Sequence, residues 1–277
     1  MSFQLQIANF DHPDLGLVVG LPDQKVRDVL TSDRAAINLA RSLVARFDKI
    51  EGNKYYRYLG DNRFYVDFEE TDPSITGIIN DFLLHGEYEP ATTALVKDVV
   101  KEGMVCMDIG ASIGYFTLLL GKRVGKLGKV YSIEATSNQF PYLRRNIEAN
   151  GLENVEAYNI AAWDREELIH INANAQQKTD VQGKALDSIF RTNEPIDFIK
   201  MDIDGSEPKA LLGLEETIKR SPNLKMVIEY YPKYIEKLGL NPQDVLDFLD
   251  KYFTYDKIEG DLSSESYCNL YCTRKES

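Results

Sequence analysis

Residues 106–122 read CMDIGASIGYFTLLLGK and join an apolar run to a glycine-containing turn and then to a helical pattern. Asp108 lies at the end of the run, Gly110 begins the turn and Gly114 opens the helix. Glycine at these positions lets the backbone approach a ligand closely, and the amide groups at the start of a helix face such a ligand. The stretch therefore predicts a strand, a ligand-binding turn and a helix in succession.

The spacing of the glycines narrows the class of ligand. A dinucleotide-binding turn prefers Gly-x-Gly-x-x-Gly with a pyrophosphate at the helix start, whereas this turn has Gly-x-x-x-Gly. Asp108 would place negative charge near the phosphates of NAD, but the same charge suits the cationic amino group of S-adenosylmethionine. The turn therefore favours an adenosyl ligand without a pyrophosphate.

On both sides of this unit, from about residue 90 onward, short apolar runs alternate with helical patterns. Strands are expected at 104–109, 129–134, 155–160, 197–203 and 225–230, and helices at 113–125, 137–151, 206–221 and 241–252. The alternation predicts an α/β fold with a mostly parallel sheet and helices on both faces. The β-rich stretches 253–260 and 267–275 are expected to pair as a hairpin at the sheet edge.

The N-terminal residues have a weaker pattern. A helix-like stretch covers 33–50, and a hairpin is expected at 54–68, with Gly60, Asp61 and Asn62 at its turn. We therefore expect a small α+β cap on the substrate side at residues 1–80, followed by the main domain at 81–277.

Composition limits the partners and the compartment. The 44 acidic and 32 basic residues give a net charge of −12, which repels phosphate backbones and anionic lipids, so neither nucleic acid nor a membrane is expected as a partner. Three cysteines are too few for a disulfide framework, and the first residues lack the basic start and apolar core of a signal peptide. We expect a cytoplasmic protein; its oligomeric state stays open, and a homo-oligomer is compatible with the sequence.

Two further positions in strand order fit an adenosyl ligand. The second strand ends at Glu134, whose carboxylate can accept hydrogen bonds from both ribose hydroxyls of either NAD or S-adenosylmethionine. After the third strand, the small residues Ala161 and Ala162 leave space for an adenine ring. Trp163 either walls that pocket or belongs to the core.

Four segments, 88–122, 130–164, 185–189 and 196–213, together resemble the FkbM family of S-adenosylmethionine-dependent methyltransferases. The resemblance covers about residues 76–231. The positions that match the family motifs are Asp108, Gly110, Ala111 and Gly114 in the loop, Glu134 as the ribose acid, and Asp202, Asp204, Gly205 and Glu207 in the Asp-x-Asp/Glu-Gly-x-Glu segment. Ser112 departs mildly from the family, in which Asn is common, and this puts one cofactor contact in doubt.

The resemblance implies a class I methyltransferase fold with a seven-stranded, mostly parallel, Rossmann-like sheet. It also implies S-adenosyl-L-methionine as the cofactor and, usually, O-methylation of a hydroxyl on a small molecule or sugar. By the same resemblance, Glu89 in the Tyr-Glu-Pro segment borders the cofactor pocket, although the start of a helix explains an acid beside a proline about as well.

Methyl transfer to an alcohol requires an oriented hydroxyl and a group that removes its proton. The acids expected at the carboxyl ends of the strands are Asp202, Asp204, Glu207 and Glu229. We favour Asp202 as the general base or positioning acceptor, without a metal; alternatively, Asp202 joins Asp204 or Glu229 in holding a divalent cation. His85 is a second candidate base if the cap covers the cofactor. Lys200 either pairs with an acid or extends between helices.

Two other classes of function stay open. A nicotinamide-dependent dehydrogenase is disfavoured by the loop spacing and by Asp108. A cofactor-binding module without catalysis would keep Asp108 and Glu134 but tolerate the loss of Asp202. The residues do not identify the methyl acceptor, because substrate choice in such folds comes from caps and loops.

Overall fold

The computed structural model describes residues 47–51, 54–59, 62–67, 75, 78, 87–174, 177–190, 194–260 and 267–275. Contacts within the chain divide it into two compact units, Met1–Tyr88 and Glu89–Ser277. The expected boundary near residue 80 stays a prediction.

The N-terminal unit contains a three-stranded antiparallel sheet. Its strands are β1 (Phe47–Glu51), β2 (Lys54–Leu59) and β3 (Asn62–Asp67), in the order β1-β2-β3. The hairpin expected at 54–68 is confirmed, because β2 pairs with β3 and Leu59 lies opposite Asn62. The helix expected at 33–50 is wrong at its end, since Phe47 opens a strand paired with β2. At this position the hydrogen-bonded pairing with β2 determines the structure, despite the helix-like spacing of the apolar residues.

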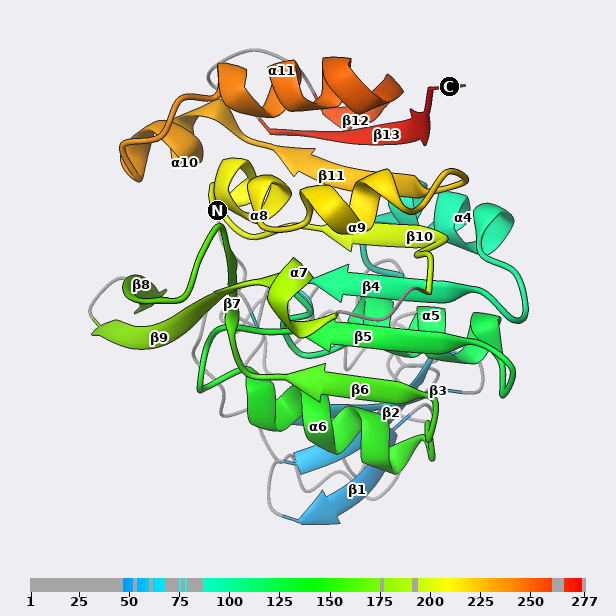
Figure 1. Ribbon diagram of the computed structural model, residues 1–277. Coiled ribbons are helices and arrows are strands. Elements are labelled where there is room, and N and C mark those ends of the chain that lie inside the picture. The colour runs from blue at the N-terminus through cyan, green and yellow to red at the C-terminus, as the bar shows by residue number, and fades with distance from the viewer. Residues whose placement is uncertain are drawn as a thin grey trace, which may run out of the picture. The chain divides into compact units, whose positions relative to one another are not determined.

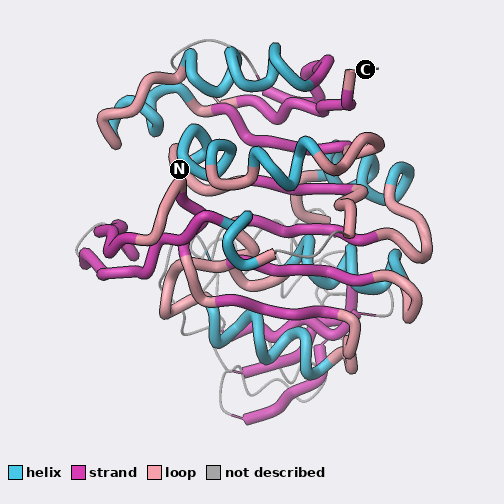
Figure 2. Tube along the Cα trace, in the orientation of Figure 1, coloured by secondary structure: helices cyan, strands magenta, loops and turns pink. Residues whose placement is uncertain are grey.

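The C-terminal unit is built on a seven-stranded sheet in the order β12-β13-β11-β10-β4-β5-β6. Its strands are β4 (Val105–Ile109), β5 (Lys129–Ile133), β6 (Val155–Tyr158), β10 (Phe198–Met201), β11 (Lys225–Tyr230), β12 (Phe253–Gly260) and β13 (Cys268–Arg274). Neighbours from β6 to β11 are parallel, and β13 runs antiparallel to both β11 and β12. Figure 2 shows these strands crossing the unit side by side.

Helices cover both faces of this sheet (Figure 1). They are α4 (Pro90–Val99), α5 (Tyr115–Val124), α6 (Phe140–Ala149), α7 (Leu186–Ile189), α8 (Glu207–Leu212), α9 (Glu215–Lys219), α10 (Pro232–Lys237) and α11 (Gln243–Tyr252). In the view of Figure 1, α7, α8 and α9 lie in front of the sheet, and α4 and α5 lie behind it. The core between the front helices and the sheet is aliphatic and aromatic, with Met107, Ile199 and Leu211 fully buried. This arrangement is the class I methyltransferase fold that the resemblance implied.

Three details differ from the sequence-based expectations. The helix expected at 206–221 is divided into α8 and α9 at Gly213, where a Cβ atom would lie 1.8 Å from the carbonyl oxygen of Trp163. The C-terminal stretches pair as expected, but β13 inserts between β11 and β12, so only β12 lies at the edge. A second sheet of β7 (Ala161–Trp163), β9 (Gln177–Ala185) and β8 (Glu167–Asn174) was not expected. Within the described part of the chain, no helix is both long and apolar enough to cross a membrane.

Candidate functional site

The carboxyl ends of four strands meet at one edge of the large sheet. The registers align the last residues of β4, β5 and β10 with the fourth residue of β11. The residues that follow these aligned positions are Gly110, Glu134, Asp202 and Glu229. From β4 the sheet continues through β5 and β6 on one side and through β10 and β11 on the other, so the strand order switches direction at β4. Open α/β sheets bind their ligands at the carboxyl ends of the strands beside such a switch.

The loop after β4 lies directly against β10. Gly110 has φ 85°, and a Cβ atom there would lie 1.7 Å from the carbonyl oxygen of Asp202. The amides of Gly110 and Ala111 both donate to the carbonyl of Ile133, each at 2.9 Å. Glycine at 110 is therefore required by the neighbouring backbone, in addition to any approach of a ligand.

The rest of this loop is held by the helix layer and by Glu134. Gly114 has φ 98°, and a Cβ atom there would lie 2.9 Å from the side chain of Leu143. Ser112 has φ 49°, and its amide donates to Glu134 Oε2 at 2.7 Å. The hydroxyl oxygen of Ser112 is buried and has no hydrogen-bond partner among the described residues.

Asp108 lies inside the sheet, one position before its edge, and is only 1% exposed. Its Oδ2 accepts a hydrogen bond from Thr117 Oγ1 at 2.5 Å, and Thr117 also contacts Ser132 Oγ at 2.9 Å. Its Oδ1 has no partner in the described part of the chain. Burial raises the pKa of Asp108 to about 6, although the charge of Lys200 and the Thr117 bond oppose the shift.

Glu134 is also buried, and both of its carboxylate oxygens accept hydrogen bonds from the chain. Oε1 accepts from the amide of Thr136 at 2.7 Å and from its hydroxyl at 2.6 Å, and Oε2 accepts from Ser112. Burial raises the pKa of Glu134, and these hydrogen bonds oppose the increase. Ribose hydroxyls would therefore share this carboxylate with the loop; the role expected for Glu134 stays a prediction.

Asp202 is paired with a buried lysine. Lys200 Nζ donates to Asp202 Oδ2 at 2.6 Å, and it lies 4.9 Å from the ring centroid of Phe116. The lysine side chain is 3% exposed and that of Asp202 is 24% exposed. Of the two alternatives for Lys200, the structure shows the pairing with an acid. The carboxylate of Asp202 remains reachable from solvent.

The other acids of this edge are in environments that favour the protonated carboxyl. Burial raises the pKa of Glu207 to about 8, with the amides of Glu207 and Ile203 opposing the shift. Burial, with the charge of Asp202 next, raises the pKa of Glu229 to about 10. Asp204 is exposed and has φ 51°. The described residues contain no group of three or more His, Cys, Asp or Glu arranged to hold a metal ion.

The expected adenine pocket lies in the second sheet. Ala161 and Ala162 are both buried in β7, and Ala162 belongs to the main core. Trp163 is half-buried, and its indole Nε1 donates to Glu167. Lys209 Nζ lies 5.8 Å from the tryptophan ring centroid. Trp163 thus lies at the border of the core, and the adenine contact stays a prediction.

Glu89 and His85 precede the first helix of this unit. Glu89 has φ 43° at the start of α4, and its Oε2 accepts a hydrogen bond from Asn269 Nδ2 at 3.2 Å. Asn269 lies opposite Glu229 in the pairing of β13 with β11, so Glu89 is joined to the acidic edge. His85 lies outside the described residues.

Comparison with known proteins decides the family. A sequence model of the Methyltransferase FkbM domain matches residues 108–256, more than half of the 277 residues. The chain belongs to the FkbM methyltransferase domain family. The FkbM domain uses S-adenosyl-L-methionine as its methyl donor, as the resemblance implied.

Individual relatives of this FkbM domain are distant. A protein-L-isoaspartate O-methyltransferase of Methanococcoides burtonii is 34% identical over 68 residues, which are 24% of this chain and 34% of that protein. The chain thus matches about a third of this relative's length. Among solved structures, a putative rRNA methylase from Clostridium thermocellum has a TM-score of 0.49 and 14% identity, covering 68% of this chain and 96% of that one. A SAM-dependent methyltransferase from Aquifex aeolicus has a TM-score of 0.45 and 22% identity, covering 74% and 100%.

The structure adds site residues of the FkbM domain that sequence reasoning missed. Thr117, Ser132 and Asn269 are all buried polar residues that contact the predicted acids directly or through one another. Each interrupts an otherwise apolar strand or helix face, and buried polar groups require partners. That interruption was the available signal. Ser206 precedes α8 but makes no capping hydrogen bond with its side chain.

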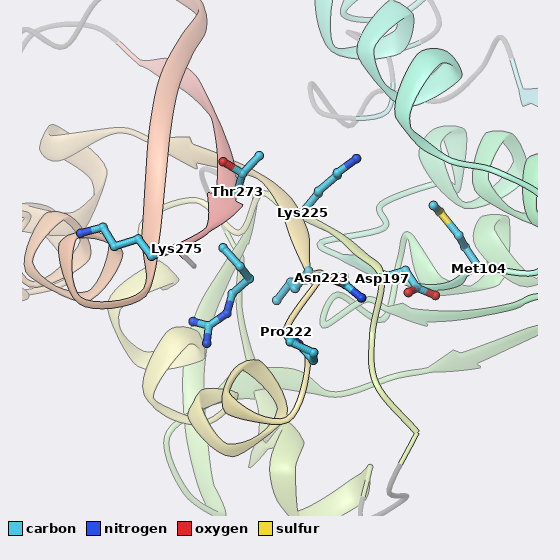
Figure 3. A pocket seen from close by; sticks show the side chains of 9 residues that line it. Met104, Asp197, Pro222, Asn223, Lys225, Thr273 and Lys275 are labelled. Atoms are coloured by element: carbon cyan, nitrogen blue, oxygen red, sulfur yellow. The ribbon is translucent and has the colours of Figure 1, made fainter. Parts of the chain in front are cut away.

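A separate pocket of the FkbM domain lies at the opposite end of the sheet, near the first residues of β10 and β11 (Figure 3). Its lining residues are Met104, Asp197, Pro222, Asn223, Leu224, Lys225, Thr273, Arg274 and Lys275. Figure 3 shows the side chains of Lys225 and Lys275 pointing away from each other. These two lysines do not converge on a common point, so the carboxyl edge is the better candidate site.

The residues at the carboxyl edge fit the methyl donor. S-Adenosylmethionine carries a cationic amino group and a sulfonium, and this edge gathers three acids, Asp108, Glu134 and Asp202, with Lys200 bonded to the last of them. Three buried polar atoms at this edge, Asp108 Oδ1, Ser112 Oγ and Glu207 Oε2, have no hydrogen-bond partner among the described residues. Because buried polar groups are nearly always paired, unpaired atoms at a ligand edge are suited to bind a polar ligand.

Proposed function

We propose that the protein transfers the methyl group of S-adenosylmethionine to a hydroxyl oxygen of a small molecule or sugar, with Asp202 as the acid that receives or orients the hydroxyl proton. The observation that carries this proposal is the hydrogen bond of 2.6 Å between buried Lys200 and part-exposed Asp202 at the carboxyl edge.

The loop from Gly110 to Gly114 and the acid Glu134 would hold the donor. Ser112 links them, because its amide already donates to the Glu134 carboxylate. When bound, the donor supplies a methyl group that its sulfonium makes electrophilic. The buried charge of Asp108 stabilises the cationic part of the donor through a low-dielectric environment. Ala161 and Ala162, followed by Trp163, would flank the adenine.

Asp202 is better suited to act as a base than its neighbours. Glu207 and Glu229 have pKa values raised to about 8 and about 10, so at neutral pH both are largely protonated and are poor proton acceptors. Asp202 instead accepts a hydrogen bond from Lys200 and is part-exposed, so its carboxyl group is held in place and remains open to an acceptor hydroxyl. Lys200 also fixes the side-chain orientation, and a fixed acceptor positions the hydroxyl for in-line attack.

The first experiment measures S-adenosylhomocysteine binding by calorimetry, with and without Mg²⁺, for the wild type, Asp108→Ala and Glu134→Ala. We expect micromolar binding by the wild type and weaker binding by both variants. A dependence on Mg²⁺ would support the alternative in which Asp202 helps to hold a metal ion. No binding by the wild type would overturn the proposal, and binding of NAD instead would favour the dehydrogenase.

The second experiment screens acceptors with radiolabelled donor, using hydroxylated small molecules, free sugars and total RNA. Transfer to a hydroxylated small molecule or sugar that Asp202→Asn reduces about 100-fold or more is the expected result. Transfer to RNA would contradict the proposed acceptor class. Donor binding with no transfer to any acceptor, and with no effect of Asp202→Asn on any activity, would favour the non-catalytic module.

A further inference from the structure

Three tyrosines gather beyond the carboxyl ends of the strands. Tyr231 follows β11, Tyr234 lies in α10 and Tyr267 precedes β13. The rings of Tyr231 and Tyr234 stack with their centroids 4.3 Å apart and their planes at 15°. The ring centroid of Tyr267 lies 6.3 Å from that of Tyr231, with the planes at 52°. We refer to these three residues as the tyrosine cluster.

The sheet and α10 place the cluster at the edge that carries the acids. The last paired positions of β11 and β13 are Tyr230 and Cys268, so Tyr231 and Tyr267 follow directly beyond that pair. In Figure 1, α10 lies beyond the tip of β11, on the side to which the arrowheads of β10, β4 and β5 point. The cluster therefore lies on the ligand side of the sheet.

The rings of the cluster are not part of the main core. Tyr267 is 41% exposed, and Tyr231 and Tyr234 are half-buried. Lys237 Nζ lies 4.3 Å from the ring centroid of Tyr234, and Tyr231 stacks on the same ring. Large aromatic rings that remain part-exposed beside a ligand edge offer apolar contact area to a ligand. Tyr267 offers the most.

The cluster is continuous with the acidic turn after β10. A Cβ atom on Gly205 would lie 2.6 Å from the backbone carbonyl of Tyr234, so this turn packs directly on α10. Burial raises the pKa of Tyr234, and the charge of Asp204 is the next cause, with Tyr231 and Glu229 adding to it. The turn that carries the exposed Asp204 thus packs against the helix that carries Tyr234.

We propose that the tyrosine cluster and Asp204 form the acceptor subsite, and that its occupant is a hydroxylated, non-aromatic ring such as a pyranose; this inference rests on the proposed function. The apolar face of such a ring packs on a tyrosine, while its hydroxyls bond to the carboxylate and to phenol groups. A purely aromatic acceptor would carry few hydrogen-bond donors for the carboxylate of Asp204. A quaternary ammonium acceptor would be repelled by Lys237, which already lies against Tyr234.

The test uses the full chain loaded with S-adenosylhomocysteine and saturation-transfer NMR with methyl glycosides of glucose, galactose, mannose, fucose and rhamnose. Phenol and choline are the competing probes. The variants are Tyr267→Ala and Tyr234→Phe, and the matched control is Leu127→Ala, an 82% exposed apolar residue in the turn before β5. We expect a glycoside signal that falls about tenfold in Tyr267→Ala, falls less in Tyr234→Phe and is unchanged in Leu127→Ala.

Each other outcome overturns the subsite. Absence of any glycoside signal from the loaded wild type, or a signal that neither tyrosine variant weakens, removes the assignment. A signal from phenol or choline in place of the glycosides would show that the tyrosine cluster binds a different class of ligand from the one proposed. If the wild type does not bind S-adenosylhomocysteine in the calorimeter, the proposed function fails first and the subsite falls with it, so the two failures are distinguished.

Discussion

Lys200 lies opposite Asp108 in the pairing of β10 with β4, while its Nζ donates to Asp202 on its own strand. One buried cation thus serves two acids, one inside the sheet and one at its edge. Its charge also lowers the pKa of Asp108 and of Glu229, against the larger effect of burial on each. The balance of charge at the candidate site therefore depends on a single lysine of an otherwise apolar strand.

Replacing Lys200 with Met should make stability more sensitive to pH. Without the cation, the carboxylates repel one another as they ionise, so the free energy of unfolding relative to the wild type should fall by about 1–3 kcal/mol between pH 6 and pH 9. Urea unfolding across this range measures the change. Lys200→Arg keeps the charge and should show a smaller pH-dependent change; an equal pH dependence in both variants would contradict the electrostatic role.

Replacing Glu207 with Gln should remove a pH-dependent loss of stability. The folded pKa of Glu207, about 8, lies above its ordinary value of 4.5, so the folded state binds the proton more tightly. Glu207 therefore makes a stabilising contribution to the free energy of unfolding that is fully present below about pH 4.5 and is lost as the pH rises toward 8. We expect Glu207→Gln to gain about 1–3 kcal/mol relative to the wild type between pH 5 and pH 8.

Chemical denaturation at pH 5 and pH 8 tests this expectation for Glu207. The side-chain oxygen of Gln can still accept the hydrogen bond from the amide of Ile203, so the substitution mainly removes the titrating group. A difference between the two proteins that is constant with pH would show that Glu207 does not titrate in this range.

Gly110→Ala should disrupt the fold at the cofactor loop. The added Cβ would lie 1.7 Å from the carbonyl oxygen of Asp202, and φ is 85°. Backbone has to move, so we expect a loss of about 3 kcal/mol or more and weaker binding of S-adenosylhomocysteine. Gly103→Ala is the matched control, because Gly103 also has φ 85° but no atom lies within 4 Å of its added Cβ. It should cost only about 1 kcal/mol, from backbone strain.

Thr117→Val should destabilise the protein by leaving Asp108 without its hydrogen-bond donor. Valine has nearly the same shape, so the cost of about 1–3 kcal/mol reports the unpaired carboxyl rather than a cavity. The loss should be larger at pH 8 than at pH 5, because the ionised form of Asp108 depends more on the donor. Thr117→Ser keeps the hydroxyl, and thermal unfolding of the pair at both pH values tests the assignment.

The elements of the large sheet could be predicted because each strand is a short apolar run between helical patterns. Glu134 and Asp202 could be placed at one edge because parallel strands carry their ends together. The small sheet of β7, β8 and β9 could not, since β7 has only three residues, β8 and β9 are rich in polar residues, and all three depend on pairing with one another. The break at Gly213 depends on the carbonyl of Trp163, a contact between residues fifty positions apart that local patterns do not encode.

The acidic residues of the candidate site could be predicted from the sequence, but the residues that donate hydrogen bonds to them could not. The Asp108, Glu134 and Asp202 positions follow from motif spacing, but the donors Thr117 and Ser112 are common residues whose role comes only from the fold. The tyrosine cluster was missed for a similar reason. Tyr231 and Tyr267 meet only because β13 pairs with β11, a register that the sequence does not display.

The position of β13 also bears on how the chain folds during synthesis. β13 is made after every other described strand, yet it lies between β11 and β12. Until it leaves the ribosome, β11 presents an open, apolar strand edge to the cell, and such edges promote association with other chains. Throughout that stage of synthesis β11 has no partner on this side, and its unpaired edge is open to association with other chains.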